Sequence, residues 1–163
     1  MAYACVRTDN MSGMVNGKDL VSVKYFEGEN EAAIENGCVV LVGEYLEGQR
    51  EVRKAMAPAA NSKLSDVALI ANEEVDKTKG HNNLNEYVNE AGMTIRGYRL
   101  VEPKQMFGVT KEAFAPSATP VKGAVVELMN GNKFNAAESA TEGSTVVGKI
   151  VAVEGIWFVI ELD

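Results

Sequence analysis

Short apolar runs alternate with turn-forming residues along most of the chain. The clearest run, 38–42, follows the turn signal Asn36-Gly37 and ends at another glycine, which is typical of a strand with both faces covered. Gly48 interrupts the apolar pattern, and a more polar strand follows over 51–54. The pattern predicts a β-hairpin around which the rest of the fold is built.

Other segments have the apolar content or the period-two alternation of strands. We expect strands at 18–26, 66–71, 94–102, 106–109, 121–129, 133–136, 144–153 and 156–162. Gly97 shifts the alternation and predicts a bulge, and Asn130-Gly131 predicts a type I′ hairpin turn. The last strand is apolar on both faces, so it is expected to be central in a sheet or covered by a partner.

One segment has the periodicity of an amphipathic helix. Leu84, Tyr87, Val88 and Ala91 have the spacing of one helical face, and Asn83 is a suitable N-cap. A helix of about nine residues is marginal in water by itself. We therefore expect one short helix, at about 83–91, that packs on a sheet.

These elements predict a mainly β fold of the α+β class. The expected architecture is a compact antiparallel β-sandwich or barrel-like lobes, with one short helix and an extended N-terminal arm over residues 1–16. Residues 17–163 form a single β-rich domain, or two lobes divided near 115–120. The arm either packs on its own domain or lies across a neighbouring subunit.

Composition narrows the classes of partner. The formal net charge is −7 and the basic residues are scattered, which argues against nucleic acid as a partner. No apolar run approaches the ~20 residues of a membrane-spanning helix, so no membrane partner is expected. The first residues lack the pattern of a signal peptide, so residence or assembly in a cytoplasm is expected.

The sequence contains no pattern typical of a catalytic or metal site. Cys5 and Cys38 lie in apolar sequence and are expected to be buried thiols, and His81 lies alone in a polar loop. Glu73 and Asp76 are expected on a solvated face. We expect no enzymatic activity, no cofactor and no metal.

The order of these signals resembles that of small structural proteins of tailed bacteriophages, of the capsid or head-decoration type. The segments that carry the resemblance are Asn36-Gly37, Gly43, the acidic turn 47–51, Ala57-Pro58, 67–71, 89–92, Arg96, Tyr98, Leu100 and 147–150. They are short and spread over residues 30–163.

The resemblance implies a virion structural protein that decorates or cements the capsid from outside, commonly as a trimer. It implies as partners the major capsid protein and further copies of the chain, and assembly in the bacterial host. The candidate interface residues are Tyr3, Met11, Met14, Val15, Trp157 and Phe158. On this hypothesis, deletion of residues 2–15 abolishes shell binding and leaves the protein folded.

Two other interpretations stay open. One is another phage structural component: a tail-tube, head–tail joining or major shell protein. The other is a β-barrel that binds a small ligand or sugar through Trp157, Phe158, Tyr98 and Phe107, which are more commonly core residues.

Overall fold

The first half of the chain folds into a sheet that closes on itself. In the computed structural model, which describes residues 2–12, 19–74 and 84–163, the strand β1 (Leu20–Glu27) pairs with β4 (Gln49–Met56) on one side and with β6 (Ile95–Arg99) on the other. β3 (Val39–Leu46) and β5 (Val67–Ile70) complete the order β1-β4-β3-β5-β6, and the short β2 (Asn30–Glu31) extends from β1. The result is a five-stranded barrel.

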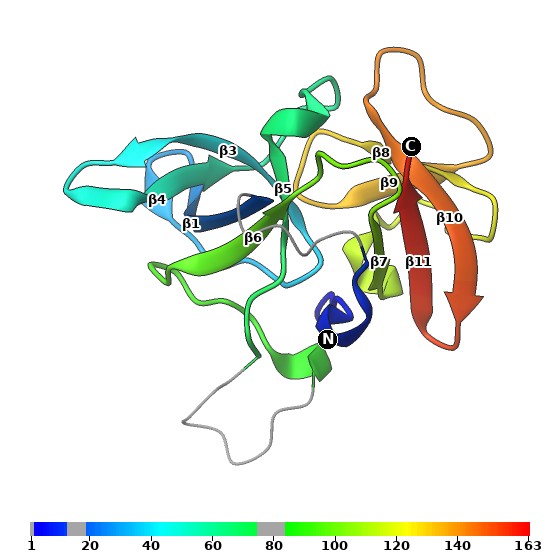
Figure 1. Cartoon of the computed structure of the whole chain (residues 1–163), viewed down its shortest axis with the longest axis horizontal. Helices are drawn as coiled ribbons and strands as arrows, with labels where there is room; N and C mark the ends of the chain where they lie inside the picture. Colours follow the sequence, from blue (N-terminus) through cyan, green and yellow to red (C-terminus); the bar gives the residue numbers. More distant parts are fainter. Residues whose placement is uncertain (1, 13–18, 75–83) are drawn as a thin grey trace.

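The second half forms an open antiparallel sheet beside the barrel (Figure 1). Its order is β7-β11-β10-β8-β9. The strands are β7 (Met106–Val109), β8 (Val125–Leu128), β9 (Phe134–Ala137), β10 (Val146–Glu154) and β11 (Trp157–Leu162). The final strand, β11, lies between β7 and β10, which is the first of the two arrangements expected for it.

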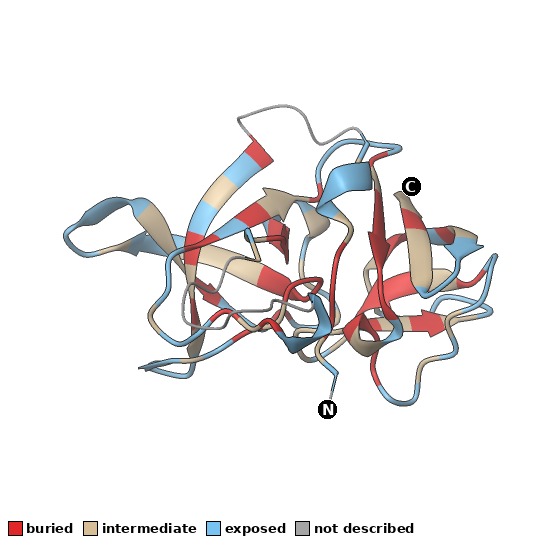
Figure 2. Cartoon of the chain, turned by 90° about the horizontal axis from the view of Figure 1, so that it is seen from below, coloured by how far each residue is buried: buried red, intermediate tan, exposed pale blue. Residues whose placement is uncertain are grey.

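This architecture confirms the predicted fold class, which is mainly antiparallel β with two sheets. The chain passes from barrel to open sheet between Arg99 and Met106, and the segment 115–120 lies within the second half. One continuous apolar core joins the halves, and Figure 2 shows buried positions gathered where they meet.

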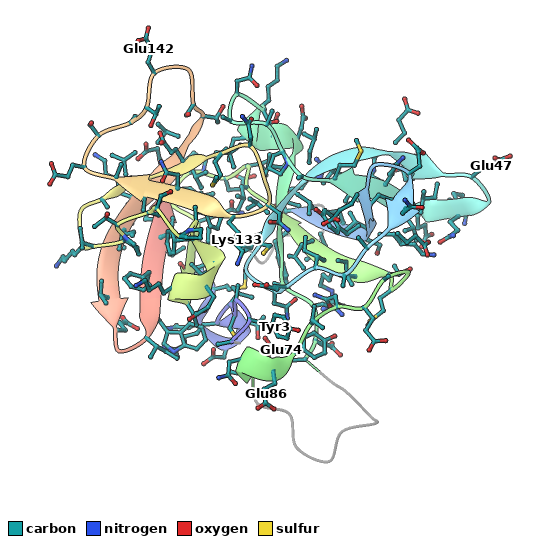
Figure 3. The ribbon with its side chains drawn as sticks, turned by 180° about the vertical axis from the view of Figure 1, so that it is seen from behind. Tyr3, Glu47, Glu74, Glu86, Lys133 and Glu142 are labelled. Atoms are coloured by element: carbon teal, nitrogen blue, oxygen red, sulfur yellow. The ribbon has the colours of Figure 1, made fainter. Side chains whose placement is uncertain are left out.

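Polar contacts also join the two halves. The carboxylate of Glu35 accepts hydrogen bonds from the Ala4 backbone N–H at 2.8 Å and from Lys133 Nζ at 3.4 Å. Lys133, which Figure 3 labels near the middle of the molecule, also donates to the Glu112 carbonyl at 2.7 Å. The N-terminal segment, the barrel and the second half therefore meet at one partly buried carboxylate.

The predicted helix at about 83–91 does not form. Its place is taken by the three-residue 3-10 turn η4 (Leu84–Glu86), after which the chain is extended; Asn83 lies outside the described residues. The backbone of Asn89 pairs with Ile34 in both directions, at 2.9 and 3.0 Å, and its side chain donates to Asn36. These tertiary hydrogen bonds require extended backbone, and they outweigh the weak preference of a nine-residue helix.

Two turn predictions also differ from the structure. β8 and β9 are joined by the five residues 129–133 rather than by a two-residue turn at Asn130-Gly131, because this loop docks on the first half. Gly131 N–H donates to Pro58 O, and Asn130 Oδ1 accepts from the Ala60 N–H. Gly97 makes no bulge: a Cβ there would lie 3.1 Å from Ala68 Cβ, so close packing inside the barrel explains the glycine.

Candidate binding surface

The N-terminal segment, residues 2–12, covers the free edge of the open sheet. Val6 bridges Val109 and Ser12 bridges Met106, both antiparallel to β7. Ala4, Cys5 and Val6 are buried, each at most 2% exposed. The arm therefore packs on its own chain, and the truncation of residues 2–15 would remove core side chains together with the proposed interface.

A cleft of about 740 Å³ opens where this segment meets the hairpin of β10 and β11. Residues from four separate stretches of sequence line it: Ala2, Tyr3, Cys5, Leu84, Asn85, Thr110, Lys111, Glu112, Gly155, Ile156, Trp157 and Phe158. We call this region the apolar cleft. In Figure 3, Tyr3 and Glu86 lie at the same end of the molecule, away from Glu47 at the tip of the β3–β4 hairpin.

The floor of the apolar cleft is held by contacts with the core. Cys5 and Thr110 exchange two hydrogen bonds, from Thr110 N–H to Cys5 O at 3.0 Å and from Cys5 N–H to Thr110 Oγ1 at 3.2 Å. Phe158 packs edge-on against Phe114, with ring centroids 5.7 Å apart. Tyr3 N–H donates to the Asn85 carbonyl at 2.9 Å, which fixes the rim.

The hairpin tip supplies the most exposed large apolar side chain of the cleft. Gly155 and Ile156 form the two-residue turn between the paired residues Glu154 and Trp157. The Ile156 side chain, which lines the cleft, is 67% exposed, whereas isoleucine is among the most buried residue types in folded proteins. Beside it, the Arg7 guanidinium lies 5.9 Å from the centroid of the Trp157 ring, a cation–π contact.

The thiol in the apolar cleft is not a nucleophile at neutral pH. Burial, followed by the nearby carboxylates of Glu74, Glu112 and Glu35, raises the pKa of Cys5 to about 11. Burial is also the main cause that raises the pKa of Cys38 to about 12. Both cysteines are free and buried, in agreement with the prediction, and the cleft offers binding contacts rather than thiolate chemistry.

The structure brings together half of the candidate interface residues. Tyr3, Trp157 and Phe158 line the apolar cleft. Met11 lies outside it, partly buried against the core, and Met14 and Val15 lie outside the described residues.

Two lining residues were missed from the sequence. The helical spacing predicts that Leu84 is buried, but it is 45% exposed. The sequence predicts that Ile156 begins a strand, but it lies in the turn; an isoleucine directly after a turn glycine is the available signal for an exposed apolar residue.

Other candidate residues do not join this surface. Phe107 is fully buried in the core, and Tyr98 lies in β6 opposite Leu20 and Leu69, so neither contributes to an aromatic ligand site with Trp157. Glu73 is exposed and lies 3.9 Å from Arg96. Asp76 and His81 fall outside the described residues.

Within the described parts of the chain, no three His, Cys, Asp or Glu side chains are grouped to hold a metal ion. The same residues include no helix that is long and apolar enough to cross a membrane. Comparison of the chain with protein-family models, with curated proteins and with solved structures found no match.

Proposed function

We propose that the chain is a non-enzymatic virion structural protein that binds the outside of a tailed-phage capsid and stabilises it, acting as a trimer. The observation that carries the proposal is the apolar cleft with Ile156 exposed at its rim. Apolar side chains gathered on a surface are characteristic of sites that bind other proteins. The resemblance of the sequence to phage head proteins supports the major capsid protein as the partner.

The construction of the cleft fits a protein that binds as a rigid body. Tyrosine and tryptophan combine a large contact area with few rotatable bonds, and they are enriched at the energetic centre of protein interfaces. The backbone of Tyr3 is held by its hydrogen bond to Asn85 and that of Trp157 by strand pairing, so little backbone entropy is lost on binding. A symmetric shell repeats each contact many times, and multivalency strengthens modest individual contacts.

Co-sedimentation with undecorated shells of the phage that encodes the chain tests the proposal. Light scattering after size-exclusion chromatography gives the oligomeric state of the free chain. Binding to shells at a fixed stoichiometry is the expected result. A chain that stays in the supernatant at every concentration would contradict the proposal.

The size of the cleft favours a second candidate function, the binding of a small apolar ligand or sugar. Its volume, about 740 Å³, lies in the range of ligand sites. A ligand in this cleft would raise the melting temperature, because it binds the folded state alone. A saturable rise in the melting temperature together with no binding to shells would favour this function over the first.

A further inference from the structure

A second surface, at one end of the barrel, is basic, whereas the cleft described above is apolar. In the strand register, Arg53 of β4 lies opposite Val23 and Tyr45, and Arg99 of β6 lies opposite Ala68. Paired residues on neighbouring strands point to the same face of a sheet. Val23 and Ala68 are fully buried, so both arginines belong to the inward face of the barrel, at the end where it opens.

The two arginines line a pocket of about 360 Å³ together with Arg50. We call it the arginine pocket; Ser22, Tyr45 and Glu51 also line it. Three arginines therefore line one pocket in a chain whose net charge is −7. The basic residues are scattered in the sequence, and the cluster arises because closure of the barrel brings β6 beside β1 and β4.

Neutral partners hold the two inner arginines in place. The Arg53 guanidinium lies 4.0 Å from the centroid of the Tyr45 ring and donates to the Gly43 carbonyl at 3.0 Å. Arg99 donates to the Ser65 carbonyl at 3.1 Å. Among the described residues, no carboxylate lies within 4.0 Å of either guanidinium. Each guanidinium has five N–H donors, so most of the donors are left for a ligand.

Two acidic residues lie near this group. Glu51 Oε1 is 3.9 Å from Arg50, and both of these side chains are more than four-fifths exposed, so the contact is weak. Asp19 is buried directly before β1, and no ion pair joins it to Arg99. Three guanidinium groups still exceed the two carboxylates.

We propose that the arginine pocket binds a phosphate-type oxyanion. The arginines that line it are Arg50 and Arg53 on β4 and Arg99 on β6. A tetrahedral anion has enough acceptor oxygens for all three groups, whereas a carboxylate has two. The mouth of a β-barrel is a common location for a ligand site. The site is independent of the capsid-binding proposal, because it lies on other strands than the apolar cleft.

Titration with inorganic phosphate at constant ionic strength, followed by backbone amide NMR shifts, tests the site. We expect saturable shifts at the residues of the pocket, with chloride and acetate giving none that saturate in the same range. Glycerol phosphate is titrated in parallel. Saturation by either phosphate compound supports the proposal, and the tighter of the two identifies the preferred form.

Matched arginine variants localise the binding. Arg99→Gln should weaken phosphate binding by about tenfold or more, because a charged hydrogen-bond donor is lost. Arg96→Gln is the control, since Arg96 is on the same strand and outside the pocket. If Arg99→Gln does not fold, Arg53→Lys, which keeps the charge but loses the planar fork, should still weaken binding.

Three results would overturn the proposal. The first is the absence of saturable phosphate binding by the folded chain. The second is equal phosphate affinity in Arg99→Gln and Arg96→Gln. The third is an equal response to acetate, which would show a general anion effect rather than recognition of a tetrahedral group.

Discussion

The two halves of the molecule differ in how the edges of their sheets are covered. The barrel closes through the pairing of β1 with β6, so the backbone hydrogen-bonding groups of its strands pair with one another. The second sheet stays open, and the edge of β7 is covered by the N-terminal segment, from the opposite end of the chain. An uncovered strand edge exposes unpaired backbone groups and invites aggregation. The open sheet therefore needs a segment outside its own strands to cover the β7 edge, whereas the barrel closes with its own strands.

The arginine pocket and the apolar cleft belong to different halves of the molecule. The arginine pocket lies within the closed barrel and is built from its own strands. The apolar cleft lies along the seam where the N-terminal segment meets the open sheet. We therefore expect the cleft, and not the arginine pocket, to be sensitive to changes that loosen this segment.

Among the variants that test this difference between the halves, Gly37→Ala is expected to lower the free energy of unfolding most. Gly37 has a φ of +80°, and a Cβ there would lie 2.9 Å from the carbonyl oxygen of Cys5 in the N-terminal segment. The backbone conformation and the overlap should together cost about 3 kcal/mol of unfolding free energy. Denaturant unfolding, followed by the fluorescence of Trp157 in the second half, measures the loss.

Gly48→Ala is the matched control for that variant. Gly48 has a φ of +72° in the β3–β4 turn, and a Cβ there would meet no atom within 4 Å. Its cost should be about 1 kcal/mol, from backbone conformation alone. Equal losses for the two glycine variants would show that the contact between Gly37 and the N-terminal segment contributes nothing to stability.

An intermediate effect is expected from Glu127→Gln within the open sheet. The buried Glu127 carboxylate accepts hydrogen bonds from Asn135 Nδ2 at 2.7 Å, Thr141 N–H at 2.8 Å and Thr141 Oγ1 at 2.6 Å. A glutamine would turn one acceptor into a donor that faces donors. Chemical denaturation at neutral pH should show a loss of about 2 kcal/mol.

The titration of the Glu127 carboxylate should make the stability of the protein depend on pH. Burial raises the pKa of Glu127, but the hydrogen bonds from Thr141 and Asn135 outweigh it and hold the pKa below its usual value. Its contribution to stability is therefore full above the unfolded-state pKa, about 4.3, and is lost as the pH falls through the lower folded-state pKa. The difference in stability between wild type and Glu127→Gln should shrink across that acidic range; a constant difference would contradict this explanation.

The smallest expected difference is in the labelling rates of the two thiols, Cys5 and Cys38. Their raised pKa values leave little thiolate at pH 8, so both should react slowly with a thiol reagent in the native protein. Cys5 should react before Cys38, because it lies in the N-terminal segment and lines the apolar cleft, whereas Cys38 has no exposed surface. Mass spectrometry of partly labelled protein gives the order, and labelling of Cys38 first would show that the barrel opens more readily.

Local patterns predicted the strands well, because alternation and turn residues act over a few positions. The strand expected at 106–109 has these bounds in the structure, and the break at Gly48 is the turn between β3 and β4. Contacts between distant segments were beyond this reasoning. The pairing of Asn89 with Ile34, which replaces the predicted helix, and the closure of β1 on β6 are long-range contacts without a local signal.

Part of the apolar cleft could be predicted from the sequence. Tyr3, Trp157 and Phe158 were selected from their sequence context, and the fold gathers them in one cleft. The arginine pocket was missed because Arg99 is far from Arg50 and Arg53 along the chain, so no charge cluster is visible in the sequence.

Shell co-sedimentation with matched surface variants tests most directly whether the apolar cleft is the binding surface. Ile156→Ser removes the exposed side chain at its rim, and Val121→Ser is the control, since Val121 is 50% exposed and lies outside the cleft. Both variants should keep the wild-type melting temperature. We predict that Ile156→Ser weakens shell binding by about tenfold or more, while Val121→Ser binds like wild type. Equal binding of the two variants to shells would contradict the assignment of the apolar cleft.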